Sequence, residues 1–308
     1  MFEHNKHKKL ISFLAVAALG GAAQGVHAHA GFKEQIDSGT STQSAKWNAV
    51  TITHGCNSNA GGEGSTAPHK DVIALSVVFP DFTKTSNVVM RKSLSTATVT
   101  AGEEPTVTSF ENDIVDSTAD VALKTSIALD MGGDQLFANN LPTVDASGNN
   151  RGWQGWNGNF PIKGPVLIES AKKPDGSDIS TTGLSPFRIG GIQFKETSCA
   201  KTLRIRVAVA DWCGKGNKSY KDAASNVDVW IGSKTALFND PATMPNESQA
   251  IFWPTLTINN KDYDATACAS ADYDTLFIEP STADIDAMLP MRKQKYPKGS
   301  GEKYWPTK

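Results

Sequence analysis

The sequence predicts an all-β fold: an antiparallel β-sandwich of the immunoglobulin-like or cupredoxin-like kind, with long loops and a short C-terminal helix. Its apolar segments are short and rich in β-branched and aromatic residues, and Gly/Asn/Asp-rich turn sequences separate them. With 308 residues, 39% of them hydrophobic, the chain can bury a substantial core. The formal net charge of −2 gives no reason to expect nucleic-acid binding.

The first residues have the composition of a secretory signal. A basic run at 6–9 precedes the apolar stretch LISFLAVAALGGAA, which is too short to span a bilayer. The small-x-small rule allows cleavage after Ala28, which leaves His29 as the first residue, or after Ala30, which leaves Gly31. We favour the first site. The signal peptide would then be residues 1–28, and the mature protein would be periplasmic or secreted.

Six segments are predicted to be strands. LRIRVAVA (203–210) alternates apolar residues with arginines and alanines, which is typical of a half-buried antiparallel strand. The other five are WNAVTI, VIALSVVF, FRIGGIQF, VDVWI and PTLTI, starting at Trp47, Val72, Phe187, Val227 and Pro254. We assign residues 29–279 to one sandwich domain. Within it, residues from about 93 to 185 are predicted to form long loops or an insertion.

Residues 280–308 are expected to form a short helix and a basic tail. The helix should begin near Ser281, in STADIDAML, where a hydroxyl cap precedes acidic residues. The tail from Met291 is expected to be ordered or frayed, and a docking role for it is the less favoured interpretation.

Two polar segments are interpreted as ordinary surface. DASGNNRG (145–152) has the alternating oxygen-bearing residues of a calcium loop, but it lacks the bidentate glutamate, so a plain turn is favoured. The acidic pair Glu103 and Glu104 lies in a polar loop and is expected to be solvated. There is no G-x-S-x-G motif and no histidine after His69, so nothing supports hydrolytic catalysis.

Four cysteines form an even set in a chain that is expected to be exported: Cys56, Cys199, Cys213 and Cys268. Two disulfides are therefore expected, and three connectivities are open. The absence of a CxxC pair argues against a zinc knuckle and against a thioredoxin-like redox site.

All six histidines lie at or before position 69, and cleavage after Ala28 would leave His29, His54 and His69. Histidines this scattered are usually surface residues, and for His69, in the loop sequence APHKD, this interpretation stays open. An N-terminal His29, however, offers its amine and Nδ1 as two in-plane donors, which suits the tetragonal geometry of Cu(II). The three histidines are therefore our candidate copper ligands. Binding should weaken in acid, because the amine, with a pKa of about 7.7 to 8.0, must lose its proton.

The stretch SAKWNAVTITHGCNSNAGGEGSTAPHKDVIALSVVFPD resembles the YcnI-like copper-binding family. Members of that family start the mature chain at histidine, and an HGC…G…T…V…P run often follows about 25 residues later. CAKTLRIRVAVADWCGKG and FWPTLTI resemble two further strands of the family. Together these pieces cover about half of the mature chain.

The resemblance implies that His29 is a bidentate copper ligand and that His54 is a further ligand or a pocket wall. It also implies that Cys56 pairs with Cys213 and Cys199 with Cys268. One departure concerns the metal-binding glutamate that some members have after an aromatic residue: this chain has Asn48 there, after Trp47.

Tryptophans near the copper are another feature of the family. Trp153 and Trp156, in the Gly/Asn-rich segment RGWQGWNGNFP, are the candidates for this cofactor-binding role, because the negative face of an indole attracts a cation. A purely structural role for both stays open. Trp212 is expected to pack in the core beside Cys213.

Three functions compete. The favoured one is a non-enzymatic copper-binding protein for storage, delivery or sensing, partnered by a membrane copper transporter or a copper-accepting protein. The second is an oxidase like the copper-dependent polysaccharide monooxygenases, with His54 or His69 across the metal and an exposed aromatic platform that includes Trp153. The third is a metal-free cell-surface interaction module, which becomes the favoured function if the mature chain starts at Gly31.

Overall fold

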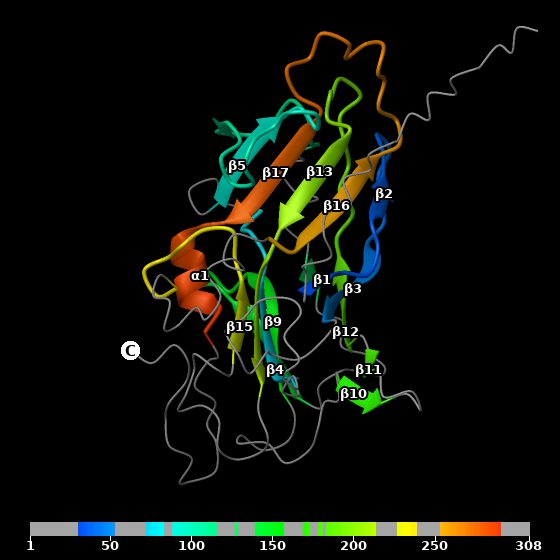
Figure 1. Cartoon of the computed structure of the whole chain (residues 1–308). Coiled ribbons are helices and arrows are strands. Elements are labelled where there is room, and N and C mark those ends of the chain that lie inside the picture. Colours follow the sequence, from blue (N-terminus) through cyan, green and yellow to red (C-terminus); the bar gives the residue numbers. More distant parts are fainter. Residues whose placement is uncertain are drawn as a thin grey trace, which may run out of the picture.

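The fold is known from a computed structural model, which describes residues 30–52, 72–82, 88–115, 127–128, 139–156, 169–172, 178–180, 183–213, 227–238 and 253–290. Within these ranges the chain forms three sheets, a two-stranded ribbon and one short helix (Figure 1). This confirms the predicted all-β, sandwich-like fold with a short C-terminal helix. No helix in the described ranges is both long and apolar enough to cross a membrane.

A five-stranded antiparallel sheet forms one layer of the lower half in Figure 1. Its strands, in spatial order, are β15 (Val227–Trp230), β14 (Ala208–Cys213), β4 (Val72–Val78), β9 (Asn150–Trp156) and β8 (Asn139–Val144). β8 and β9 come from the segment predicted to be loop-rich, and β9 lies inside the sheet between β4 and β8. In the turn between them, the Asp145 carboxylate accepts hydrogen bonds from the backbone N–H groups of Ser147 and Asn149.

A four-stranded antiparallel sheet faces this layer. Its strands are β1 (Ala30–Phe32), β3 (Lys46–Ile52), β12 (Gly183–Ile189) and β7 (Ile127–Ala128), and the ribbon is β10 (Glu169–Lys172) with β11 (Asp178–Ser180). An aromatic cluster joins the two sheets: Phe79 and Trp153 from one side meet Phe187 from the other, with ring centroids 5.3 and 5.6 Å from that of Phe187. The rings are at most 1% exposed. The burial of these rings contributes apolar contact between the layers.

The upper half is a six-stranded mixed sheet. Its strands are β2 (Ile36–Ser38), β16 (Thr255–Asn260), β13 (Thr202–Arg206), β17 (Thr275–Pro280), β5 (Val88–Ser93) and β6 (Thr106–Val107). The pairs β2/β16 and β13/β17 are parallel, and the others are antiparallel.

The predicted single strand 203–210 is divided between two sheets. β13 ends at Arg206, and β14 starts at Ala208 in the five-stranded sheet, so the chain changes sheets at Val207. Strands that switch sheets in this way connect the layers of a sandwich. Neither Arg206 nor Ala208 faces solvent, since they are 3% and 0% exposed. The half-exposed strand predicted from the alternation is therefore wrong for this part of the segment.

Four other predicted strands occur close to their expected positions, as β3, β4, β15 and β16. FRIGGIQF agrees less well, because β12 begins earlier, at Gly183, and ends at Ile189. At Gly191 the chain passes so close to Gln43 that a Cβ atom would lie 1.9 Å from its carbonyl oxygen, and this approach ends the regular pairing.

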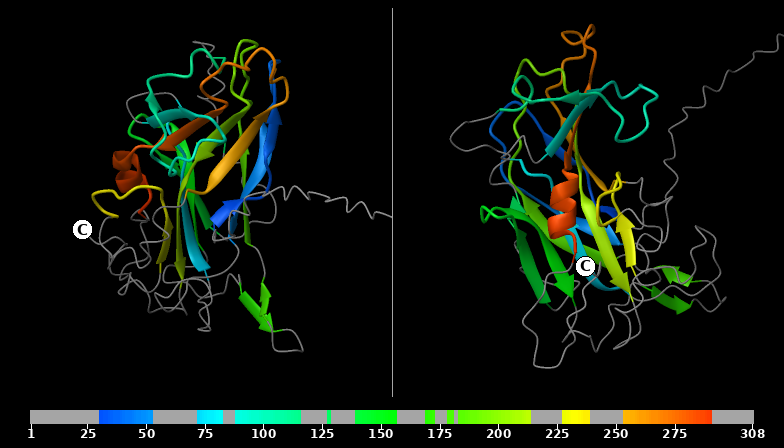
Figure 2. Two further views of the ribbon diagram at one scale, coloured as in Figure 1. Left: turned by 45° about the horizontal axis from the view of Figure 1, so that its top comes forward. Right: turned by 90° about the vertical axis from the view of Figure 1, so that its left-hand side faces the viewer.

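The predicted helix is confirmed as α1 (Thr282–Met288), with Ser281 as its N-cap. The backbone N–H of Asp284 donates to the Ser281 hydroxyl at 3.1 Å. Ile285 and Met288 are buried, and the right-hand view of Figure 2 shows the helix lying over the five-stranded sheet, where Gln154 of β9 donates to the Met288 carbonyl oxygen. The helix therefore connects the end of β17 to the lower half of the molecule.

Candidate functional site

The histidines predicted to bind copper, His29, His54 and His69, lie outside the described residues, as does Cys56. The strand residues beside two of them are described: Ala30, which follows His29, is paired with Ile52, which is two residues before His54. Within the described ranges, no group of three or more His, Cys, Asp or Glu side chains is arranged to hold a metal ion. The metal-site prediction therefore depends on the chain just beyond β1 and β3.

The predicted exposed platform at Trp153 is wrong, because this indole is a core residue. It is 1% exposed, it lies against Phe79 and Phe187, and its Nε1–H donates to the Ser185 hydroxyl at 2.9 Å. Trp156 ends β9, paired with Ala74 and Asn139, and its side chain is outside the described part of the structure.

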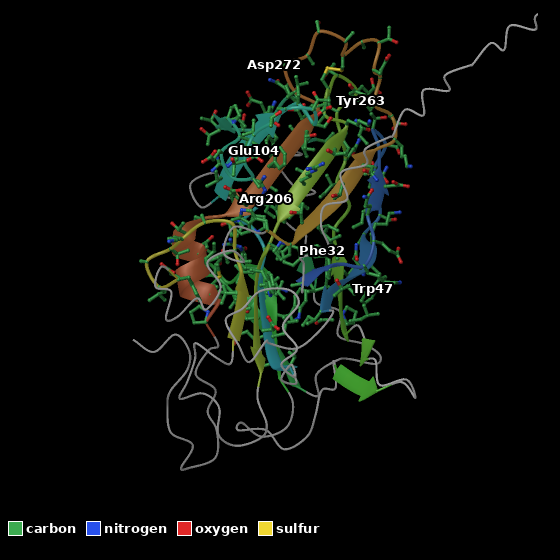
Figure 3. All side chains as sticks on the ribbon, in the orientation of Figure 1. Phe32, Trp47, Glu104, Arg206, Tyr263 and Asp272 are labelled. Atoms are coloured by element: carbon green, nitrogen blue, oxygen red, sulfur yellow. A yellow bond between two sulfur atoms is a disulfide. The ribbon has the colours of Figure 1, made fainter. Side chains whose placement is uncertain are left out.

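An exposed tryptophan occurs elsewhere, at Trp47 on β3, which is 51% exposed (Figure 3). The next residue, Asn48, stands where the resemblance would place a metal-binding glutamate. Its side chain is buried and joins β3 to the chain after β1, by donating to the Glu34 carbonyl oxygen at 2.8 Å. Asn48 thus has a structural partner.

The disulfide between Cys199 and Cys268 is confirmed, with Cα atoms 5.4 Å apart. Cys199 lies just before β13, and Cys268 lies in the connection between β16 and β17. The other implied pair, Cys56 with Cys213, stays a prediction because Cys56 is not described.

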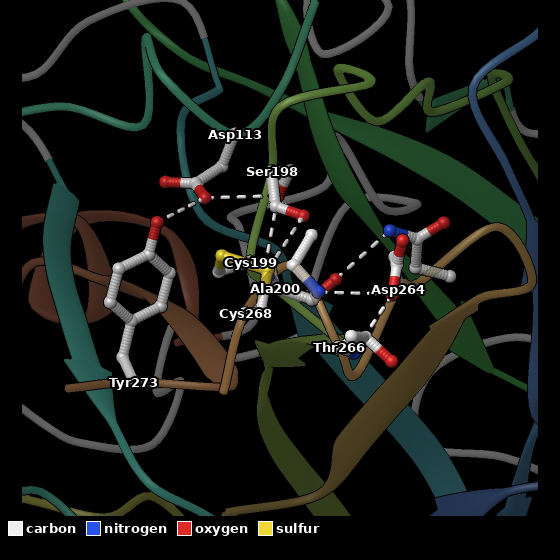
Figure 4. Close-up of a disulfide and its surroundings, with 10 residues drawn as sticks. Asp113, Ser198, Cys199, Ala200, Asp264, Thr266, Cys268 and Tyr273 are labelled. Atoms are coloured by element: carbon white, nitrogen blue, oxygen red, sulfur yellow. Dashed lines mark hydrogen bonds between the residues drawn. A yellow bond between two sulfur atoms is a disulfide. The ribbon is translucent and has the colours of Figure 1, made fainter. Parts of the chain in front are cut away.

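A buried carboxylate organises the surroundings of this disulfide (Figure 4). Asp113 accepts hydrogen bonds from the Tyr273 hydroxyl at 2.7 Å and from the Ser198 hydroxyl at 2.9 Å, and it pairs with the Lys92 ammonium at 2.5 Å. Burial and the hydrogen bond to Asp113 both raise the pKa of Tyr273. A phenol held protonated in this way is a fixed hydrogen-bond donor, so this cluster has a structural role.

A second buried cluster was missed in the sequence, and it overturns one prediction. Glu104, expected to be solvated, is 5% exposed and pairs with Arg206 through both carboxylate oxygens. Arg206 also donates to Glu279 at 2.8 Å. Figure 3 shows Glu104 and Arg206 together on the six-stranded sheet. Of the predicted acidic pair, Glu104 is therefore part of an ion-pair network, whereas Glu103 is exposed as expected.

Arg91 closes this network into a ring. Its Nε donates to Glu279 at 3.0 Å and its Nη1 to the Glu104 carbonyl oxygen at 2.8 Å. We call Arg91, Glu104, Arg206 and Glu279 the charged ring. The two positive and two negative charges balance, which is how buried charges avoid a large desolvation penalty.

The charged ring also fixes the loop that carries Glu104. The backbone N–H of Gly102 donates to the same carboxylate at 2.9 Å. Burial acts to raise the pKa of Glu104, but the hydrogen bonds and the charge of Arg206 outweigh it, so that the pKa lies below its ordinary value. In sequence, Arg206 lies 102 residues from Glu104 and 73 from Glu279, so no local pattern could have predicted the ring.

The comparisons with known proteins add no relative: no protein-family model matches the chain, and no curated protein or solved structure shows significant similarity to it. The resemblance to the YcnI-like family stays a prediction.

Proposed function

We propose that the protein is an exported copper-binding protein that stores, delivers or senses copper, with His29 as an N-terminal chelate. The supporting observation is the register of β1 against β3, in which Ala30 lies opposite Ile52. One peptide bond joins His29 to Ala30, and two separate Ile52 from His54. The connectivity of the chain therefore permits both histidines to reach one metal ion beside this strand pair.

The donor set suits Cu(II). The amine and Nδ1 of His29 close a ring with the metal, and the imidazole of His54 would add a third nitrogen in the tetragonal arrangement that Cu(II) prefers. His69, three residues before β4, is a further candidate ligand. Copper is the cargo in this proposal. The partner would be a membrane copper transporter or a copper-accepting protein.

The described residues do not support the oxidase at the position predicted for its platform. The oxidase needs an exposed aromatic platform, and Trp153 is 1% exposed. The metal-free module depends on where the peptidase cuts, so mass spectrometry of the mature protein distinguishes it: a start at His29 supports copper binding, and a start at Gly31 favours the module.

Calorimetry with Cu(II) on protein that starts at His29 tests the proposal. We expect one tight site, which His29→Ala abolishes. A variant with one extra glycine before His29 should also lose most of its affinity, because it keeps the imidazole but removes the α-amine from the chelate. Trp47→Ala, which removes an exposed aromatic side chain, is the matched control and should bind Cu(II) normally. Undiminished binding by His29→Ala would overturn the proposal.

A further inference from the structure

An open cavity of about 460 Å³ lies beside the charged ring, in the size range of small-molecule sites. The loop 100–103 and the turn at Gly232 and Ser233 supply two of its walls, and the end of β17 supplies another. The two walls approach each other closely, since a Cβ atom on Gly102 would lie 3.8 Å from the Gly232 carbonyl oxygen. Gly102 has a φ of 94°, a conformation that glycine adopts readily.

Arg91 presents a fixed hydrogen-bond donor to this cavity. Two of its nitrogens are held by Glu279 and by the Glu104 carbonyl oxygen, and its side chain is 16% exposed. Among the described residues, its third nitrogen, Nη2, has no acceptor. A guanidinium that is already oriented loses little freedom when it binds a ligand oxygen.

The rest of the lining is rich in hydroxyl groups and has apolar patches. Hydroxyls come from Thr100, Ser233, Ser281 and Thr282, and apolar surface comes from Val89, Ala101 and Pro280. Hydroxyl groups both donate and accept hydrogen bonds, so the lining matches a ligand that carries hydroxyls on an apolar carbon ring.

The charge balance selects against anions. The charged ring is neutral as a whole, and the remaining ionisable group of the lining, Glu103, is an exposed carboxylate. The carboxylate of Glu103 would repel an anionic ligand, and the arginines of the charged ring are already neutralised by their own carboxylate partners.

We propose that the cavity binds a neutral saccharide, with Arg91 donating to one of its oxygens. Neutral saccharides combine hydroxyl groups with apolar C–H faces, as the lining requires. The site consists entirely of described residues and does not depend on copper, so it can be tested separately from the proposed copper function.

Calorimetry on the full mature chain should show saturable binding of at least one of glucose, galactose, N-acetylglucosamine and cellobiose. We expect a dissociation constant of about 1 mM or below, as is typical of a small site. Glucuronate, an anionic sugar of similar shape, should bind at least tenfold more weakly. Absence of binding by all four neutral sugars would overturn the proposal, and so would preferential binding of glucuronate.

Two variants place the binding in this cavity. Ser233→Trp introduces a large side chain at an exposed position of the wall and should weaken binding at least tenfold with little change in the melting temperature. Arg91→Lys keeps the positive charge but loses the planar guanidinium with its several N–H donors, and it should also weaken binding. Arg204→Lys, on β13 outside the lining, is the matched control and should bind normally. Normal binding by Ser233→Trp would contradict the proposal.

Discussion

The aromatic cluster between the lower sheets and the charged ring on the upper sheet are both buried, but they are held in different ways. In the cluster, Phe79, Trp153 and Phe187 pack with ring centroids 5.3 to 6.0 Å apart, and each ring gains from leaving water. In the charged ring, each member is costly to bury alone, and only the complete set compensates that cost. A gap in an apolar cluster leaves a cavity, whereas a gap in the ring leaves an unpaired buried charge.

The largest effect should come from opening the charged ring at Arg206. In Arg206→Met, two buried carboxylates lose their shared partner, and we expect the free energy of unfolding to fall by about 3 to 5 kcal/mol. Urea denaturation measures this loss. Arg204→Met, two residues away on β13, is the control, because Arg204 has no ion pair among the described residues, and its loss should be under about 1 kcal/mol. Equal losses in the two variants would mean that the ring contributes no more than an ordinary arginine does.

A smaller loss of stability should follow when the aromatic cluster loses the hydrogen bond between Trp153 and Ser185. Ser185→Ala removes the acceptor of the buried Trp153 Nε1–H, at a cost of about 1 to 3 kcal/mol. Urea denaturation should show this loss, and tryptophan fluorescence should still indicate a buried indole. Leu184→Ala, at the exposed neighbouring position, is the control and should change stability little. A fluorescence shift to that of a solvated indole in Ser185→Ala would contradict the core position of Trp153.

The contrast between these regions also explains which predictions succeeded. Some elements are specified by residues that are adjacent in the sequence, so the sequence pattern alone predicts them. These are the strands β3, β4 and β16 and the helix after Ser281. Trp153 was misjudged because the glycines around it indicated a loop. Gly152 instead allows β9 to approach β4, where a Cβ atom would lie 1.9 Å from the Val77 carbonyl oxygen.

The charged ring could not be predicted for a different reason. The alternation around Arg206 indicated a solvent-facing side chain, and Glu104 followed another acid in a polar loop. Only the pairing of β13 with β17, and the return of the loop after β5, bring these charges together. The copper site remains untested, because His29 and His54 lie beyond the described strand ends.

Acid should weaken the charged ring while leaving the aromatic cluster intact. The pKa of Glu104 is lower in the folded protein than its ordinary value of 4.5, so the unfolded chain binds a proton first as the pH falls. The stability that comes from Glu104 is present above about pH 4.5 and is lost as the pH falls through the folded pKa. Urea denaturation between pH 7 and pH 3 should show a shallower decline in Glu104→Gln than in the wild type. Parallel profiles would show that the ionisation of Glu104 is not coupled to folding.

The smallest effect concerns helix α1, which connects the strand that carries Glu279 to the lower sheets. Ser281→Ala removes the cap on the Asp284 N–H and should lower the free energy of unfolding by about 1 kcal/mol. Ser281→Asp is the matched control, because a carboxylate can replace the hydroxyl as acceptor and also interacts favourably with the helix N-terminus. Thermal unfolding should therefore rank Ser281→Asp close to the wild type and above Ser281→Ala. If both variants were equally destabilised, the hydroxyl of Ser281 would matter for a contact other than the cap, such as one across the cavity that it lines.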